Sequence, residues 1–304
     1  MSEIVDLSKL DAPNVLEDLD FEQLLEERKA RFISLYPDNE KAFWTKRLSL
    51  ESEPIVKLLE ENCYMQLQER QRINEAAKAT MLAYATGSDL DVIAANFNVK
   101  RLVIQPADNA VTPAISEILE SDEELRLRCQ LAFEGLSTAG PRASYIFHAL
   151  SAHADVADVS VISPSPANVT VTVLSRNDDG VASKELLNTV AKALNDDSVR
   201  PIADRVLVQS ASITEYQINA KVYLYKGPEA EPIKNQILSR LNKYVKERRR
   251  LGRDITLSSI YAVIHTEGVQ RVELLNPTKD ILLDDTKATK CTALNIEVKI
   301  SDDQ

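Results

Sequence analysis

The chain has 304 residues and a formal net charge of −11 at pH 7. That length can bury a substantial core and divide into two or three domains. The acidic balance argues against nucleic-acid binding, which depends largely on basic side chains that release counterions. No apolar run approaches the roughly 20 residues that span a bilayer, and the acidic start lacks the pattern of a secretory signal. We therefore expect a soluble protein made in the cytoplasm.

The first third of the chain has the periodicity of helices. In residues 20–37 apolar residues recur at helical intervals until Pro37. A second, long helix is predicted over residues 54–86, with Pro54 in its first turn and Gly87 as its terminator. At about 1.5 Å per residue it would reach roughly 45 to 50 Å, more than a compact domain needs for its own core. Ser88, with Asp91 three positions later, predicts the capping box of a further short helix.

The long predicted helix carries a stripe of mostly apolar residues that could bind a partner. Its members are Ile55, Leu58, Leu59, Asn62, Met65, Ile73, Ala77, Met81 and Tyr84. Neighbouring helices of the same chain could cover this stripe, and so could a helix of another protein. The sequence leaves both alternatives open.

The rest of the chain alternates helical and strand patterns. Ser121 and Glu124 predict a capping box, and Gly140 with Pro141 precedes another helix. Residues 156–162 and 168–174 alternate apolar and polar side chains, as half-buried strands do, and a proline-rich turn joins them in which Asn168 tolerates left-handed geometry. One face of the helix that follows is apolar, and a strand pattern then resumes. That face comprises Leu186, Leu187, Val190, Ala191 and Leu194.

A similar order of helix, valine-centred strand, proline turn and strand recurs near the C-terminus. We therefore predict an α+β fold with several domains. A helical N-terminal arm (residues 1–110) would precede two tandem small α+β modules, a first module (residues 111–211) and a second module (residues 212–304). Such a chain suits a rigid spacer or assembly part better than an enzyme built around one cleft.

A basic segment at residues 243–253 ends a strong helical pattern. Its cations are Lys243, Lys246, Arg248, Arg249, Arg250 and Arg253. Cations suit a helix C-terminus, with Gly252 in or near the terminating turn. Alternatively, the segment is a basic patch that docks on an acidic partner surface. Both interpretations remain open at this point.

The residues that usually carry chemistry do not form a recognisable site. His148 and His153 are five positions apart, which separates them by roughly 140° around a helix, so they cannot share one face as zinc-binding histidines do. Ser137 lacks the spacing of a nucleophile elbow, and the adjacent Asp284 and Asp285 are typical of a solvated turn. The glycines form no phosphate-binding motif. We predict no catalytic, cofactor or metal site, and no enzyme.

Five ordered blocks of the sequence resemble a known family. They are "ERQRINEAAKATMLAYATGSDLDVIAANFNVKR", "ESDEELRLRCQLAFEGLSTAGPRASYIFHA", "VADVSVISPSPANVTVTVL", "VRPIADRV" and "LGRDITLSSIYAVIHTEGVQRVELLNP". Together they look like the baseplate J-like proteins of contractile phage tails, over nearly the whole chain. One departure is that family members often have a glycine after the proline pair, where this chain has Ala167 and Asn168.

The resemblance implies a structural protein of the virion baseplate, made in the host bacterial cytoplasm. Copies would link wedge subunits into a ring around the hub and support tail assembly and sheath contraction. Implied partners are a lysozyme-like wedge protein that contacts the sheath, a wedge protein that connects to the tail fibres, and other copies of the chain as a dimer or ring. The helical arm would join a bundle with partner helices. Two alternatives remain: the same fold in a tail-derived bacteriocin or other contractile injection device, and a cytoplasmic α+β enzyme.

Overall fold

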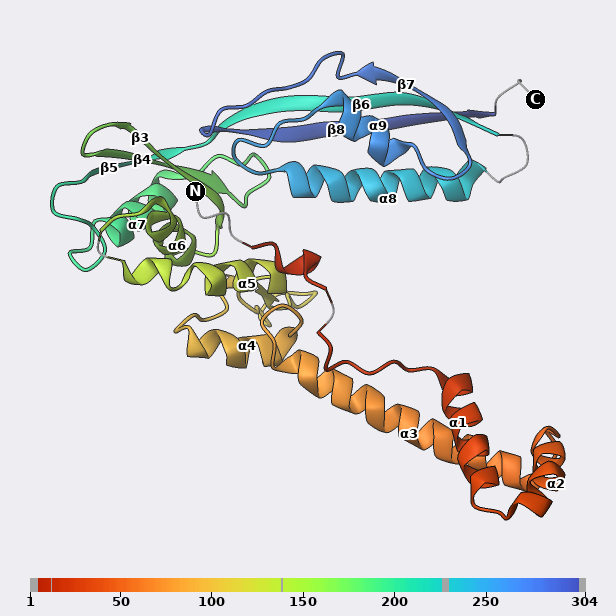
Figure 1. The fold of residues 1–304 in the computed structure, drawn as a ribbon. Helices are drawn as coiled ribbons and strands as arrows, with labels where there is room; N and C mark the ends of the chain where they lie inside the picture. Colours follow the sequence, from red (N-terminus) through yellow and green to blue (C-terminus); the bar gives the residue numbers. More distant parts are fainter. Residues whose placement is uncertain (1–4, 12, 138, 226–229, 301–304) are drawn as a thin grey trace. The chain divides into compact units, whose positions relative to one another are not determined.

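The chain folds into two compact units. The computed structural model describes residues 5–11, 13–137, 139–225 and 230–300 (Figure 1). The N-terminal unit spans Met1–Lys100 and the C-terminal unit spans Arg101–Gln304. Within the described residues the N-terminal unit is helical, whereas the C-terminal unit combines helices with small sheets. This confirms the predicted α+β class, with helices first and two α+β modules after them.

The N-terminal unit is built on one long helix and shorter neighbours. The elements are η1 (Leu7–Lys9, a 3-10 helix), α1 (Phe21–Ser34), α2 (Asp38–Leu48), α3 (Pro54–Ala79) and α4 (Gly87–Asn96). The carboxylate of Asp20 starts α1 by accepting the N–H of Gln23 at 3.0 Å. Phe32, Tyr36, Phe43 and Trp44 form contacting aromatic pairs that join α1 to α2.

The long helix α3 is shorter than its sequence predicts. It begins at Pro54, as expected for a residue without an N–H, but ends at Ala79. The hydroxyl of Thr80 donates to the carbonyl of Ala77 at 2.8 Å, one of the local bonds that compete with helix continuation. The predicted end at residue 86 is therefore wrong. Gly87, with φ +54°, is the first residue of α4 and does not terminate α3 as predicted. Ser88 lies inside α4, so it is not the N-cap of that helix, which is Thr86.

Helix α1 covers one flank of α3. Leu24 and Leu25 are buried together with Cys63 of α3, and partly buried apolar residues pack around them. Further along α3, the side-chain amide of Asn74 accepts the N–H of Glu17 at 3.0 Å and donates to its carbonyl at 2.8 Å. Arg70 adds an ion pair to the Glu17 carboxylate at 2.9 Å. The segment before α1 is thereby tied to the same helix.

The first module forms a mixed three-stranded sheet backed by helices. Its elements, with those just before it, are β1 (Val103–Gln105), β2 (Ile118–Leu119), α5 (Asp122–Leu131), η2 (Glu134–Leu136), α6 (Arg142–Ala152), β3 (Val156–Ser165), β4 (Asn168–Ser175), α7 (Lys184–Leu194) and β5 (Arg205–Ser210). The strand order is β3-β4-β5, with β3 antiparallel and β5 parallel to the central strand. Leu186, Val190 and Leu194 of α7 are buried in its core, as predicted.

A buried ion pair closes the first module. The guanidinium of Arg128 donates to the carboxylate of Glu120 at 2.8 and 2.6 Å, and both side chains are nearly inaccessible. The same carboxylate accepts the N–H of Leu102 at 3.0 Å. Ser121 and Glu124 form the predicted capping box at the start of α5. Arg128 on α5 thus holds the chain between β2 and α5 in place.

The second module also has a mixed three-stranded sheet, but its central strand is the first of the three in the chain, whereas in the first module it is the second. Its elements are β6 (Ser212–Leu224), α8 (Ala230–Arg248), α9 (Leu257–Ile264), β7 (Val269–Asn276) and β8 (Lys287–Ile300). The central strand β6 has β7 antiparallel on one side and β8 parallel on the other. In the first module the two strands joined by the proline turn pair with each other, whereas β7 and β8 flank β6. The recurrence of the element order therefore did not predict the pairing.

The two modules are joined by nearly continuous chain. Only Ala211 separates β5 from β6, and it is buried with Leu174 and Ala288 in a small apolar cluster. The N–H of Leu251 donates to the carboxylate of Asp158 on β3 at 2.8 Å. Burial raises the pKa of Asp158, while the hydrogen bond from Leu251 and the nearby charge of Arg250 act in the opposite direction.

Candidate functional site: protein-binding surfaces

One flank of α3 exposes large apolar side chains. Leu58, Met65 and Ile73 are 63%, 53% and 56% exposed, although each is of a type that usually buries part of its surface. At 100° per residue these three lie within an arc of about 80° on the helix. The side chains packed against α1 lie on the adjacent arc. We call this exposed set, with Asn62 between its members, the open flank of α3.

The structure divides the predicted stripe into four parts. Leu58, Met65 and Ile73 belong to the open flank, whereas Leu59 packs against the α1 core. Ile55, Asn62 and Ala77 are partly buried on α3. Met81 and Tyr84 lie beyond the end of the helix, and the Tyr84 hydroxyl donates to the carbonyl of Asp11 at 3.2 Å. Neighbouring helices of the same chain therefore cover some of the stripe but not all of it.

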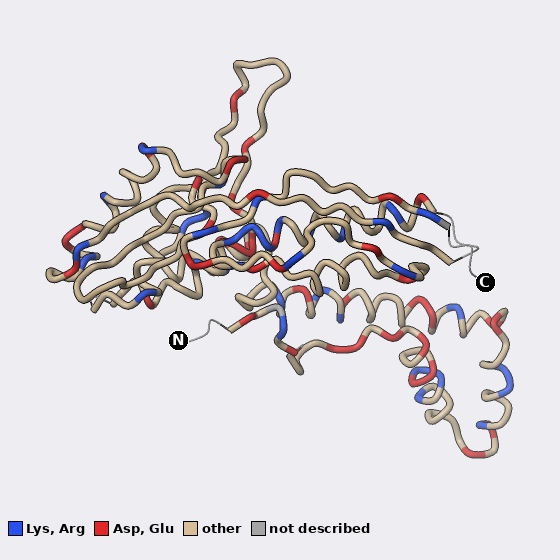
Figure 2. The backbone as a smooth tube through the Cα atoms, turned by 90° about the horizontal axis from the view of Figure 1, so that it is seen from above, with Lys and Arg blue, Asp and Glu red and all other residues tan. Residues whose placement is uncertain are grey.

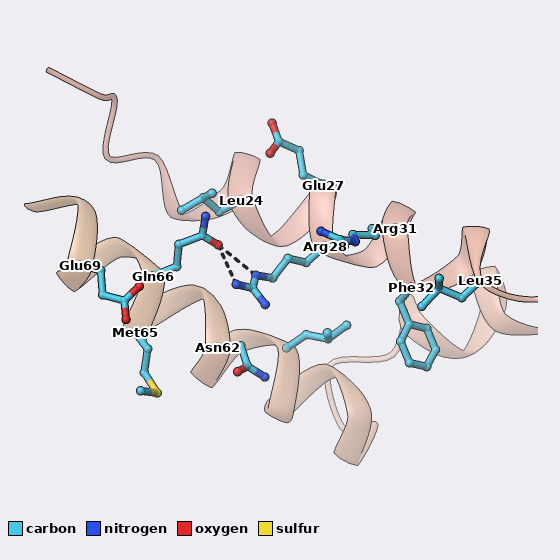
Figure 3. Close-up of a pocket in the computed structure, with 11 residues that line it drawn as sticks. Leu24, Glu27, Arg28, Arg31, Phe32, Leu35, Asn62, Met65, Gln66 and Glu69 are labelled. Carbon is cyan, nitrogen blue, oxygen red and sulfur yellow. Dashed lines mark hydrogen bonds between the residues drawn. The ribbon is translucent and has the colours of Figure 1, made fainter. Parts of the chain in front are cut away.

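A groove of ≈ 740 Å³ runs between α1 and α3 beside the open flank. Its lining combines apolar side chains with paired polar ones: Leu24, Glu27, Arg28, Arg31, Phe32, Leu35, Leu59, Asn62, Met65, Gln66 and Glu69. Figure 3 shows Arg28 on α1 and Gln66 on α3 reaching toward each other, where Arg28 donates to the amide oxygen at 2.7 and 3.2 Å. The α1 side of this groove was not predicted from the sequence, although the apolar residues of α1 recur at helical spacing.

Part of the basic segment is used inside the C-terminal unit. The guanidinium of Arg249 donates to the carbonyls of Asn177 and Asp178 of the first module, the latter at 3.0 Å. The Arg248 guanidinium lies 5.5 Å from the ring centre of Tyr244. Gly252, with φ +65°, turns the chain after α8 as predicted. Arg248 and Arg249 therefore have partners within the C-terminal unit.

Four cations of the segment, Arg249 among them, lie on a cleft between the modules. Lys243, Lys246, Arg249 and Arg250 line one side of this cleft of ≈ 540 Å³, and residues from β1 to α5 and from β3–β4 line the other. Arg253 is exposed beyond the cleft lining. Figure 2 shows Lys and Arg interspersed with Asp and Glu along both units, so a local concentration of cations is distinctive in this acidic chain. We call the cleft lined by Lys243, Lys246, Arg249 and Arg250 the α5–α8 cleft.

The histidines and acidic pairs have structural surroundings. His148 Nε2 lies 3.0 Å from the carbonyl of Gly135, and His153 Nδ1 accepts the N–H of Asp155 at 3.1 Å. Asp284 accepts bonds from Thr286, and the hydrogen bond from Lys287 lowers the pKa of Asp284 to about 2. Among the described residues no group of three or more His, Cys, Asp or Glu side chains could hold a metal ion.

Within the described ranges, no helix combines the length and apolar character that crossing a bilayer requires. Cys63 and Cys129 are buried as free thiols, and burial raises the pKa of each. With open apolar and charged surfaces on a scaffold of helices and small sheets, the fold is that of a multidomain α+β assembly protein.

Comparisons with known proteins agree with this class. Three family models match in chain order: the Baseplate J-like N-terminal domain over residues 51–108, the Baseplate J-like central domain over residues 137–210, and the Baseplate J-like protein C-terminal domain over residues 216–297. "Baseplate protein J" of Escherichia phage P2 is 56% identical over 300 residues, which is 99% of each chain. The chain therefore belongs to the baseplate J-like family and is a structural protein of a phage-tail baseplate in the virion.

A solved structure is also similar at low identity. It is a chain of "Cryo-EM structure of the anti-feeding prophage (AFP) baseplate, 6-fold symmetrised", with 13% sequence identity and a TM-score of 0.40. The match covers 62% of this chain and 48% of that one, so the chain spans about half the length of that relative.

Proposed function

We propose that the protein is a non-catalytic wedge component that links baseplate subunits into a ring around the hub and supports tail assembly and sheath contraction. Family membership supports a structural role among other baseplate proteins. Under this proposal residues 1–110 bind partner helices, and the modules at 111–211 and 212–304 hold copies together. The partners would be the lysozyme-like wedge protein at the sheath and the wedge protein that connects to the tail fibres.

The open flank of α3 is the observation that carries this proposal. Three large apolar residues exposed in one arc cost free energy in water, and covering them with a helix would recover roughly 25 cal/mol per Å² of apolar surface. An amphipathic partner helix lying in the groove between α1 and α3 would contact Leu58 and Met65 at a spacing of two turns. The polar pair Arg28–Gln66 lies at the same groove and could fix the register of that helix.

The experiment replaces Leu58 and Met65 together by Asp in the full chain. Both side chains are exposed, so we expect normal folding by circular dichroism, together with loss of co-purification with the other wedge proteins of the same phage. A matched control places Asp at Tyr64, which is equally exposed but on the far side of α3. Unchanged co-purification of the double variant would exclude the open flank as the partner site.

A further inference from the structure

The α5–α8 cleft has the chemistry of a site for an acidic segment with one apolar side chain. Its lining includes the apolar residues Ile104, Leu119 and Ala157, and Leu119 is substantially exposed. Five cationic side chains line the cleft against three anionic ones. The whole chain has a net charge of −11, but the excess of cations at this cleft would attract an acidic ligand.

Some of the lining charges are already paired, and this defines the free side of the cleft. Arg176 binds Glu124 at 2.7 Å, and Arg249 binds backbone carbonyls of the first module. Lys243 and Lys246 are exposed at the rim, and Lys243 is only loosely associated with Glu247 at 3.8 Å. The rim lysines therefore have capacity to bind carboxylates of another chain.

A loop of the same chain carries the complementary chemistry. In residues 280–285, Leu282 is 73% exposed and is flanked by Asp280, Asp284 and Asp285. Asp284 is paired with Lys287 at 2.7 Å and Asp280 accepts the N–H of Leu257 at 2.7 Å, while the neighbouring Asp285 is exposed. The loop thus presents an apolar side chain among negative charges.

The loop is held in a fixed conformation that projects Leu282. Ile281 exchanges backbone hydrogen bonds with Ile255 at 3.0 and 2.9 Å, and its side chain packs on the core of the second module. The N–H of Leu283 donates to Asp254 at 2.7 Å. Because both neighbours of Leu282 are anchored, little conformational entropy is lost when Leu282 is buried by a partner.

We propose that the α5–α8 cleft of one copy binds the 280–285 loop of a second copy. Leu282 would contact the apolar lining residues, and the loop carboxylates would face Lys243 and Lys246. This contact rests on the proposed function, in which copies of the chain associate, and it assigns a surface to that association. It uses surfaces of the C-terminal unit alone, so its test is independent of the open flank of α3.

The test measures self-association of the full chain by sedimentation velocity at low and high salt. We expect concentration-dependent association that weakens with salt, since exposed charges are screened. The variants Leu282→Asp and Lys243→Glu/Lys246→Glu should each weaken association at least about tenfold, the effect of 1.4 kcal/mol. The controls Ile202→Asp and Lys184→Glu/Lys192→Glu make the same changes at exposed positions outside the cleft and the loop, and should have no effect.

A mixing experiment separates a lost contact from a misfolded variant. Chains with Leu282→Asp keep an intact cleft, and chains with Lys243→Glu/Lys246→Glu keep an intact loop. Equimolar mixing should therefore restore association between the two, although neither associates alone. A monomeric wild-type chain at every soluble concentration, or variants that associate like the wild type, would overturn the cleft contact. Loss of partner co-purification in the Leu58/Met65 variant with self-association intact would leave both proposals standing.

Discussion

The N-terminal unit leaves apolar surface open along its longest helix, whereas the C-terminal unit packs helices over an apolar core on each of its two three-stranded sheets. In the former, α1 covers one flank of α3 while Leu58, Met65 and Ile73 stay exposed. In the latter, each three-stranded sheet has a face covered by helices. The hydrophobic effect acts on both units alike. The difference is that helices of the same chain cover the two sheets, whereas no described helix covers the open flank of α3.

This contrast indicates that different residues determine the stability of the fold and the association with partners. A substitution in the closed cores should lower the free energy of unfolding, while one on the open flank should affect association and leave folding nearly unchanged. Trp44, the one tryptophan of the chain, lies in the N-terminal unit, so its fluorescence reports on that unit. Far-UV circular dichroism reports on both units, and the two probes together can locate each effect.

The largest expected effect comes from breaking the buried ion pair of the first module. Arg128→Ala leaves the Glu120 carboxylate buried without its cation, which typically costs about 3–5 kcal/mol. Urea denaturation followed by circular dichroism should show this loss, with the Trp44 transition little changed. Arg142→Ala, an exposed arginine on α6, is the control and should stay within about 0.5 kcal/mol of the wild type. A loss below 1 kcal/mol for Arg128→Ala would mean that the first module is not closed as described.

A pair of identical substitutions compares the units directly. Leu194→Ala removes a fully buried side chain from the first module and should cost about 2–5 kcal/mol, the usual range for a leucine cavity. Leu58→Ala on the open flank removes a mostly exposed side chain and should cost less than about 0.5 kcal/mol. Denaturation by urea of both variants gives the two values. Equal losses would show that the open flank is covered in the isolated chain.

A smaller, pH-dependent effect is expected at the ion pair beside the cleft. Desolvation raises the pKa of Glu124, but the hydrogen bond and charge of Arg176 and bonds from Ser121 lower it overall. A lowered pKa in the folded state means that the ionised carboxylate stabilises the fold above the ordinary pKa of 4.5, and that this contribution is lost as the pH falls through the lowered value.

Glu124→Gln should therefore cost about 1 kcal/mol at pH 7, an estimate reduced for partial exposure, and the difference from the wild type should shrink below pH 4.5. Glu123→Gln in the same helical turn is the matched control, because Glu123 is exposed. Urea denaturation across this pH range gives both curves. A difference that grows on acidification would contradict the lowered pKa.

The features that were predictable from sequence depend on local contacts. The buried face of α7, the capping box of Ser121 and the hairpin of β3 and β4 follow from spacing within a few residues, and the structure confirms them. The start of α3 at Pro54 belongs to the same class. The family resemblance was equally accessible, since it rests on ordered blocks of sequence.

The features that were missed depend on distant partners. Nothing near residues 243–253 shows that Arg249 binds carbonyls of Asn177 and Asp178, 72 and 71 residues earlier in the chain. The second sheet pairs β6 with β8 across an insertion of two helices and a strand, so the local order of elements could not predict it. The division of the stripe on α3 likewise follows from where α1 packs, and the helical period alone cannot supply that.

The turn between β3 and β4 gives the smallest expected effect and one of opposite sign. Ala167 has φ +61°, the left-handed region that Asn168 was predicted to occupy and that costs a residue with a Cβ roughly 1–2 kcal/mol. Ala167→Gly removes this cost but enlarges the entropy of the unfolded chain, so the net gain should be up to about 1 kcal/mol.

The matched change in the other unit is Ala76→Gly on the exposed surface of α3, where the backbone is helical. There glycine brings only its entropic cost, and the free energy of unfolding should fall by about 1 kcal/mol. Thermal denaturation of both variants tests this, because the two changes in unfolding free energy should have opposite signs. If Ala167→Gly also destabilises, the turn does not hold Ala167 in left-handed geometry, and the departure from the family glycine carries no strain.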